Sequence, residues 1–235
     1  PGYSSSSLCC YDEDGVQHHV WGVEMDKIIG AILTNIVEIG MDIGDLAEGD
    51  AKSLGDTIGR EFMAMFPDLP YDENGLPVRE GVVPYYNSPE QTNTKWLKEN
   101  EDGQYIHEIE IMPYVSQYLG DKSEEWTFNF NTDFRQNSVD CAKDLDEYIE
   151  AVCEYTGAEK VNILAVSHGG QTSATYLSLY GYKGRVNNAV LTVPAIGGAG
   201  LASDILADNM KFDEETLLYF LENGFMLLPS SPEMR

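Results

Sequence analysis

The stretch that decides the fold is Val161-Asn162-Ile163-Leu164-Ala165-Val166-Ser167-His168-Gly169-Gly170. A mostly apolar run leads into Ser-His-Gly-Gly, and a helical pattern from Thr172 to Tyr180 follows at once. A strand that stops on a serine and turns sharply into a helix is the layout of a nucleophile elbow. Such a turn needs minimal side chains two positions before and after the serine, and Ala165 and Gly169 supply them. The sequence therefore predicts that Ser167 is a nucleophile whose hydroxyl projects away from a parallel sheet.

Two other interpretations of this stretch are a buried parallel strand with an ordinary tight turn, and a phosphate cradle of a nucleotide-binding fold. The elbow is favoured because neither G-x-G-x-x-G nor G-K-[ST] accompanies the stretch. In an elbow, the backbone N–H of His168 lies at a helix N-terminus and points toward a developing oxyanion. His168 is therefore predicted to contribute an oxyanion donor.

The flanking residues extend this pattern to β-α-β-α-β over residues 126–193. Aromatic residues alternate in strand fashion over 126–130, and Asn137 or Ser138 is a suitable cap for a helix that Gly157 ends. A further strand is predicted from Val186 to Val193, where Pro194 closes it. The elbow strand is thus expected in the middle of the sheet, between the strands near residues 128 and 191.

The first half of the chain carries weaker signals. Residues 1–15 are predicted to form a loop, and His18 and His19 to lie in a polar loop. Apolar residues recur at helical spacing over residues 21–46, which suits either a packed core or a cap that faces an apolar substrate. Prolines and glycines make residues 67–105 loop-like, with short strands or an excursion between sheet elements over 76–86. A short helix is predicted over 110–119.

Composition excludes some classes of partner. The 235 residues are 43% hydrophobic and 11% aromatic, which is typical of a folded protein. The net charge of −26 disfavours nucleic acids and anionic membrane surfaces as electrostatic partners. No apolar run is long enough for a transmembrane helix.

The cysteines do not form a metal-binding pattern. No C-x-x-C pair is present, so no metal site is expected. Cys141 and Cys153 share one face of the predicted helix but lie three turns apart, too far for a disulfide. The vicinal Cys9 and Cys10 are left open as reduced thiols or as partners of another cysteine, so the redox compartment and the localisation stay open.

Several separated motifs together resemble the lecithin:cholesterol acyltransferase family of α/β-hydrolases. Pro1-Gly2-Tyr3-Ser4-Ser5-Ser6-Ser7 is similar to that family's oxyanion segment, and the resemblance implies that the Tyr3 amide is a second oxyanion donor. Thr132-Asp133-Phe134-Arg135 is similar to its Tyr-Asp-Trp-Arg. Val166-Ser167-His168-Gly169-Gly170 is similar to its His-Ser-x-Gly-Gly, except that Val166 stands in place of the histidine. Val193-Pro194-Ala195-Ile196-Gly197-Gly198 is similar to its Ala-Pro-x-x-Gly-Ser. The resemblance implies that Asp133, Arg135, Gly169, Gly170 and Pro194 support the site, and that Trp21 lies in a cap. For Asp133 and Arg135, an ion pair that holds a strand end is favoured over direct catalysis.

The implied fold class is α/β: an α/β-hydrolase fold with a mostly parallel sheet, helices on both faces and an inserted cap or lid. The expected organisation is a partial domain over residues 1–235, incomplete at both ends. Residues 15–125 would include the cap, 126–200 the core with the elbow, and 201–235 the start of the lid. Exposed apolar residues along the sheet are expected from this incompleteness.

The implied function is acyl transfer on lipid esters through an acyl-enzyme on Ser167, as an O-acyltransferase or a phospholipase. The triad of such enzymes runs in the order Ser, Asp or Glu, His, and no histidine follows Ser167 other than the adjacent His168. The triad acid and base are therefore expected outside this chain. No cofactor is expected, and the partners are an ester substrate and, by resemblance, a lipid surface. The alternatives are a non-catalytic binding protein on the hydrolase fold, or another esterase, thioesterase or peptidase on that fold.

Overall fold

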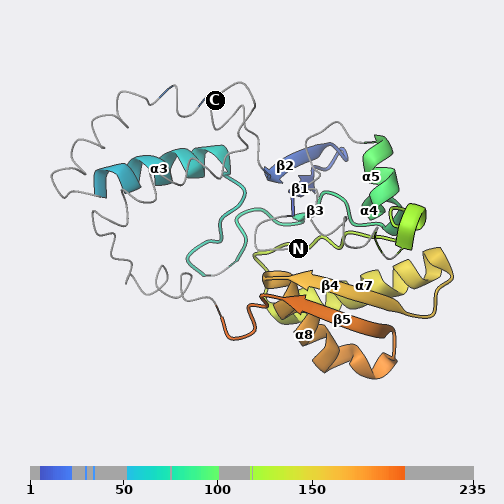
Figure 1. Ribbon diagram of the computed structural model, residues 1–235. Helices are drawn as coiled ribbons and strands as arrows, with labels where there is room; N and C mark the ends of the chain where they lie inside the picture. Colours follow the sequence, from blue (N-terminus) through green and yellow to red (C-terminus); the bar gives the residue numbers. More distant parts are fainter. Residues whose placement is uncertain are drawn as a thin grey trace, which may run out of the picture. The chain divides into compact units, whose positions relative to one another are not determined.

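The computed structural model describes residues 6–22, 52–74, 76–100 and 119–198, together with Gly30, Thr34 and Gln117. The chain divides into two compact units, each considered by itself: Pro1–Glu24 with Phe66–Gly197, and Met25–Met65 with Gly198–Arg235. The second unit contributes the helix α3 (Lys52–Met65), which the sequence did not predict. The remaining described helices and all described strands belong to the first unit (Figure 1).

A parallel pair of strands carries the elbow. The strands are β4 (Val161–Val166) and β5 (Val186–Thr192), connected by helix α8 (His168–Tyr180) and the 3-10 helix η2 (Gly181–Lys183). Their register places Leu164 opposite Val190 and Val166 opposite Thr192. The predicted strands and the predicted helix between them are therefore confirmed, and the strands end at the same edge of the sheet.

Helix α7 (Ser138–Thr156) precedes β4 and begins and ends where the sequence predicts. The Asn137 side chain accepts hydrogen bonds from the N–H groups of Val139 and Asp140, so it caps the first turn. Gly157 adopts φ 73° and its N–H donates to the Cys153 carbonyl, which ends the helix in a left-handed cap.

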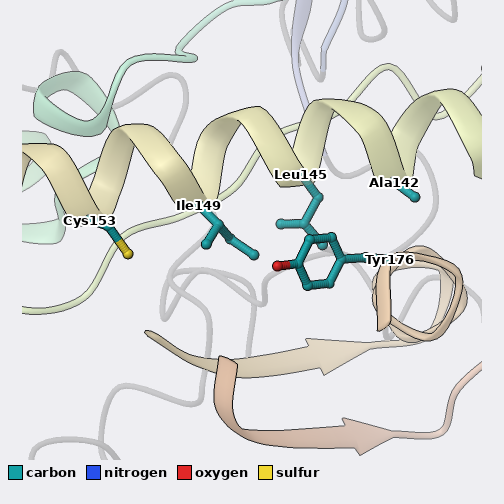
Figure 2. Close-up of a cluster of buried hydrophobic side chains, with 5 residues drawn as sticks. All are labelled: Ala142, Leu145, Ile149, Cys153 and Tyr176. Carbon is teal, nitrogen blue, oxygen red and sulfur yellow. The ribbon is translucent and has the colours of Figure 1, made fainter. Parts of the chain in front are cut away.

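The main core lies between α7 and α8. Figure 2 shows four side chains on one side of α7 facing Tyr176 of α8, and the five buried residues are Ala142, Leu145, Ile149, Cys153 and Tyr176. Burial of one large apolar side chain contributes about 1.5–3 kcal/mol to stability, so these buried side chains account for the packing of α7 against α8. Val161, Ile163 and Val186 pack against the same cluster from the sheet.

The opposite face of the parallel pair is exposed. Side chains alternate between the faces of a strand, so Leu164 lies on the face opposite Ile163. Leu164 is 44% exposed and its cross-strand partner Val190 is 57% exposed. The expected exposed apolar residues are therefore present, whereas the expected helical cover of both faces is not seen in the described part of the chain.

The strand predicted over residues 126–130 does not form, and this expectation was wrong. Phe128 makes only an isolated bridge with Asn93. Among the described residues β4 pairs with β5 alone, so it does not occupy the central position in the sheet that the sequence predicted. The N–H of Asn129 donates to the Thr92 carbonyl (2.9 Å) instead of a ladder partner. The aromatic alternation is explained by packing on α7, because the ring of Phe130 lies 5.2 Å from that of Tyr148.

An antiparallel sheet in the order β2-β1-β3 forms where a loop was predicted. Its strands are β1 (Leu8–Tyr11), β2 (Gln17–Trp21) and β3 (Val83–Pro84). The predicted loop over residues 1–15 was therefore wrong for Leu8–Tyr11, and the polar loop predicted for His18 and His19 was wrong, whereas residues 1–5 lie outside the described residues. Asp12 closes the turn between β1 and β2, because its Oδ1 accepts from the N–H groups of Asp14 and Val16. Because the Asp12 side chain stabilises this turn, the four residues of β1 can pair with β2 within a short polar segment.

The second core cluster lies on this sheet. It consists of Leu8, Cys10, Val20 and Phe134, with Trp21, Leu69 and Val82 packed against it. Neighbouring strand residues point to opposite faces, so Cys9 and Cys10 do not bridge each other in β1. All four cysteines are buried and unpaired by disulfides.

The segment between the two sheets is more helical than predicted. It contains α4 (Pro89–Thr92), α5 (Thr94–Asn100) and the 3-10 helix η1 (Gly120–Lys122), whereas the short strands predicted over 76–86 are confirmed by β3 and by the bridge between Tyr71 and Pro77. The helix predicted over 110–119 and most of the apolar block over 21–46 lie outside the described residues. None of the helices described in the structure combines the length and apolarity that crossing a membrane requires.

Candidate active site

Ser167 lies in a sharp turn between β4 and α8, as the sequence predicts. Its backbone adopts φ 52° and ψ −116°, a conformation that residues with side chains rarely adopt. Ser167 occupies the N-cap position of α8, yet its hydroxyl makes no capping hydrogen bond. Backbone strain of this kind is concentrated at functional sites, where the surrounding structure maintains the unfavourable conformation. The geometry is that of a nucleophile elbow.

Backbone hydrogen bonds with the end of β5, with the turn after it and within α8 hold this strained residue. The Ser167 N–H donates to the Thr192 carbonyl at 3.0 Å, and the Ser167 carbonyl accepts from Ala195 at 3.1 Å. Within α8 the same carbonyl accepts from Gly170 at 3.0 Å. The turn after β5 is therefore part of the support of Ser167. The resemblance indicated this turn through Pro194, but no pattern marks the hydrogen-bonding residues Thr192 and Ala195.

The small residues predicted around the serine are enclosed. Ala165, Gly169 and Gly170 are all buried. A Cβ placed on Gly170 would lie 2.6 Å from Pro194 Cβ and 2.9 Å from Pro194 Cα, so glycine is required by the close approach of this proline. The structure thus brings together Gly170 and Pro194, two residues predicted to support the site.

His168 is the first residue of α8. The N–H groups of a helix's first turn have no acceptor within their own helix, and they carry the positive end of its dipole. The His168 side chain is buried, and this burial lowers its pKa, so the neutral ring is favoured at pH 7. The predicted second oxyanion donor, Tyr3, lies outside the described residues. The nearest described residue of its segment is Ser6, whose buried hydroxyl accepts from the Thr132 N–H at 3.2 Å.

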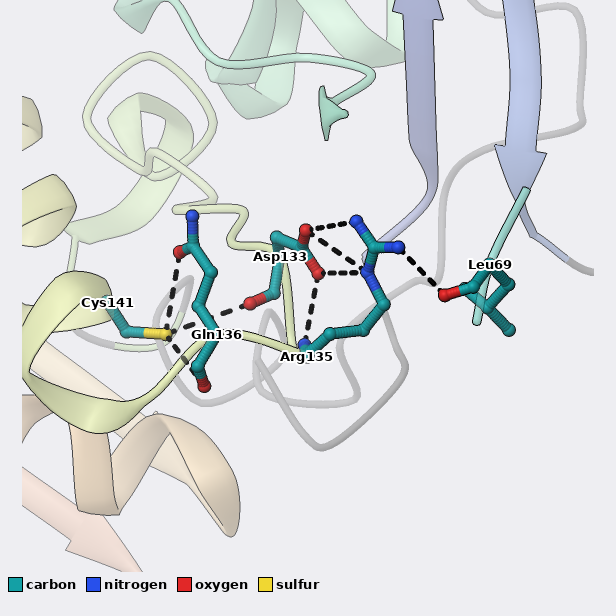
Figure 3. A network of polar contacts seen from close by, with 5 residues as sticks. All are labelled: Leu69, Asp133, Arg135, Gln136 and Cys141. Atoms are coloured by element: carbon teal, nitrogen blue, oxygen red, sulfur yellow. Dashed lines mark hydrogen bonds and ion pairs between the residues drawn. The ribbon is translucent and has the colours of Figure 1, made fainter. Parts of the chain in front are cut away.

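Asp133 and Arg135 form the buried ion pair that the sequence predicts (Figure 3). Arg135 Nη2 lies 2.6 Å from Asp133 Oδ2, and Arg135 Nε lies 2.9 Å from Asp133 Oδ1. Their side chains are 8% and 5% exposed. Burial by itself would lower the pKa of Arg135, but the hydrogen bonds to Asp133 raise it, so the guanidinium stays charged.

This ion pair fastens the segment before α7 to the rest of the unit. Arg135 Nη1 donates to the Leu69 carbonyl at 2.8 Å, and its guanidinium lies 5.4 Å from the ring centroid of Tyr71. Between the paired residues, Phe134 packs on Trp21 with ring centroids 5.6 Å apart. Trp21 is the last residue of β2 and belongs to the second core cluster. The support of the site by Asp133 and Arg135 remains a prediction.

The remaining histidines lie elsewhere. His18 is exposed on β2, with its Nε2 2.9 Å from Asp12 Oδ2. His19 is half-buried on the same strand, and His107 lies outside the described residues. Over the described ranges no group of three or more His, Cys, Asp or Glu residues is arranged to hold a metal ion.

Comparison with known proteins yields one match. Residues 87–224 match the family model described as alpha/beta hydrolase fold. These residues are more than half of the chain and include β4, Ser167, α8 and β5. No curated protein and no solved structure matches the chain. The match does not distinguish the lecithin:cholesterol acyltransferase family from other families of this fold.

Proposed function

Because the chain belongs to the α/β-hydrolase family, whose members are usually hydrolases, we propose that it is a serine acyl-transfer enzyme that acts on lipid esters. The observation that carries the proposal is the strained backbone of Ser167 at the junction of β4 and α8. An elbow presents a serine hydroxyl at the carboxyl end of a strand, where substrates of open α/β sheets bind.

In the proposed reaction, Ser167 Oγ attacks the ester carbonyl carbon while a histidine base takes its proton. The tetrahedral intermediate collapses, the alcohol leaves with the proton, and an acyl ester remains on Ser167. Water or a second alcohol then takes the acyl group by the same route. The base belongs to the family's triad, and we propose no residue of this chain for it.

The backbone N–H of His168 is proposed to stabilise the oxyanion, with Tyr3 as the second donor. One such donor contributes about 3 to 4 kcal/mol to the transition state. The neutral His168 ring adds no charge to the site, since burial lowers its pKa. The donor role of His168 is supported by its position as the first residue of α8.

A lipid ester is proposed as the substrate for two reasons. The first is the resemblance of the separated motifs to the lecithin:cholesterol acyltransferase family. The second is the exposed apolar surface that follows β5, where Val193 is 73% and Ile196 is 58% exposed. Both residues follow the strand end that is paired with the end of β4, beside Ser167. Gly169, Gly170 and Pro194 shape the turn, and Asp133 with Arg135 holds the segment before α7.

Labelling of the full-length protein with a fluorophosphonate probe tests the nucleophile. Ser167→Ala is expected to abolish labelling. Ser178→Ala is the matched control, because Ser178 is an exposed serine of the same helix α8, and this variant is expected to label normally. A wild type that is not labelled would contradict the proposal and favour the alternative, a non-catalytic binding protein on the hydrolase fold.

A substrate panel tests the lipid. Long-chain phospholipid esters in vesicles, short p-nitrophenyl esters and acyl thioesters are compared for turnover that depends on Ser167. A long-chain alcohol in the vesicles reports transfer, as a new ester, against hydrolysis, as free fatty acid. Preference for the short ester or the thioester contradicts the lipid proposal but leaves the nucleophile intact.

A further inference from the structure

Two residues with side chains have positive φ in the described part of the chain, and they lie side by side. They are Ser167 at φ 52° and Val193 at φ 41°. Val166 and Thr192 are paired in the sheet, so Ser167 and Val193 are the next residues beyond the ends of neighbouring strands. A β-branched residue at positive φ is a genuine outlier, because its branched Cβ meets the backbone. The surrounding structure must therefore impose this conformation on Val193.

The side chain of Val193 does not explain the strain. It is 73% exposed, so it fills no core space that would select valine. The residues on either side of Val193 show what the turn achieves. The Thr192 carbonyl accepts from the Ser167 N–H at 3.0 Å, and the Ala195 N–H donates to the Ser167 carbonyl at 3.1 Å. The last residue of β5 thus supplies an acceptor, and the turn after it a donor, for the two backbone groups of the nucleophile.

Pro194 provides a third contact between the turn and the elbow. Its Cβ and Cα occupy the space that a side chain at residue 170 would need. The proline ring therefore packs directly on the first turn of α8, and Pro194 lies between Thr192 and Ala195 in the chain. Thr192, at the end of β5, and Pro194 and Ala195, beyond it, therefore all contact the elbow.

We infer that Val193 and Ala195 are positioning residues for Ser167: the positive φ of Val193 shapes a turn whose backbone holds the nucleophile in its strained conformation. This inference rests on the proposed function, because it assigns residues that orient the proposed nucleophile. It also makes the conformation of residue 193, rather than its side chain, the property that controls the reactivity of Ser167.

Two substitutions at residue 193 separate conformation from side chain. Val193→Gly removes the side chain but permits positive φ, whereas Val193→Pro holds φ near −65° and forbids it. Saturation kinetics with the fluorophosphonate probe are measured on the full-length protein, well below the unfolding temperature of each variant. We expect Val193→Gly to keep the maximal labelling rate within about threefold of wild type and to unfold at an equal or higher temperature. We expect Val193→Pro to lower the maximal rate by at least about tenfold with an unchanged half-saturating probe concentration.

Ala195→Pro provides an independent test, because it removes the N–H that donates to Ser167. It is also expected to lower the maximal rate without changing the half-saturating concentration. Val190→Gly is the control for glycine in an exposed part of β5, and it is expected to reduce thermal stability while the folded protein labels at the wild-type rate.

The outcomes distinguish this inference from the proposed function. Unlabelled wild type refutes the function itself. Normal labelling of wild type together with normal maximal rates for folded Val193→Pro and Ala195→Pro refutes the positioning role. If Val193→Pro does not fold, the result for Ala195→Pro decides, and a loss of rate in Val193→Gly as large as in Ala195→Pro also overturns the inference.

Discussion

Substitution of Gly170 by alanine tests the close contact between α8 and the turn after β5. The new Cβ would lie 2.6 Å from Pro194 Cβ and 2.9 Å from Pro194 Cα. Carbon atoms prefer a separation of about 3.5–4.0 Å, so one of the two segments must move by about 1 Å. The proline is part of the turn and its Cα belongs to the backbone, so this shift displaces the groups that bond to Ser167.

The expected effects on stability and reactivity differ in size. Overpacking costs about 1–3 kcal/mol, while replacing glycine by alanine in a helix stabilises it by about 0.8–1.0 kcal/mol. A net loss near 1 kcal/mol lowers the unfolding temperature by about 2–4 °C in a chain of this length. Misplacement of reacting groups by about 1 Å costs about a hundredfold in rate. Gly170→Ala is therefore expected to stay folded but to react with the fluorophosphonate far more slowly than wild type.

Thermal unfolding and labelling rates of the full-length protein measure both effects. Gly59→Ala in α3 is the matched control, because nothing lies within 4 Å of its added Cβ. This control should unfold at an equal or higher temperature and label normally. Adding Pro194→Gly to Gly170→Ala removes the 2.6 Å contact and should restore part of the rate. Wild-type labelling by Gly170→Ala would show that the contact does not position the nucleophile.

Three further predictions concern stability and thiol reactivity. Asp133→Asn leaves the buried Arg135 guanidinium without its counter-charge and should cost about 3–5 kcal/mol in urea unfolding, and a loss below 1 kcal/mol would contradict the burial of the pair. Asn137→Ala removes the cap of α7 and should cost about 1 kcal/mol, whereas Asn137→Ser should stay close to wild type; equal losses would disprove the capping role. Burial raises the pKa of the thiols of Cys9 and Cys141, which favours their unreactive protonated form, and all four cysteines are buried. The native protein should therefore not react with Ellman's reagent at pH 8, and reaction of any thiol before unfolding would contradict this.

The local structure around the nucleophile could be predicted because it depends on residues that are close in sequence. The apolar run that ends at Ser167 and the small residues beside it define a strand, a turn and a helix within a few positions. Asn137 and Gly157 likewise end α7 through their own backbone preferences and side-chain hydrogen bonds. These signals do not require knowledge of distant partners.

The failures arose where distant residues, or side-chain hydrogen bonds within a turn, decide the outcome. The aromatic alternation over 126–130 fits a strand, but the backbone of this segment bonds to the start of α5 and its rings pack on α7. The hairpin of β1 and β2 was missed because its turn depends on the side-chain bonds of Asp12 in a segment that is otherwise polar. Periodicity carries no information about the distant partners of residues 126–130, and the Asp12 bonds, although local, leave no periodic pattern.

The sequence by itself determined the α/β-hydrolase elbow and identified Ser167 as its serine, because the strained turn selects small neighbours that can be recognised in the chain. Only the tertiary structure decided what holds that serine. The positive φ of Val193 contradicts the backbone preference of valine. The hydrogen bonds that Ser167 donates to Thr192 and accepts from Ala195 form only when β5 pairs with β4. The physical reason is that strain at one residue is maintained by contacts from another strand, and such contacts leave no local pattern.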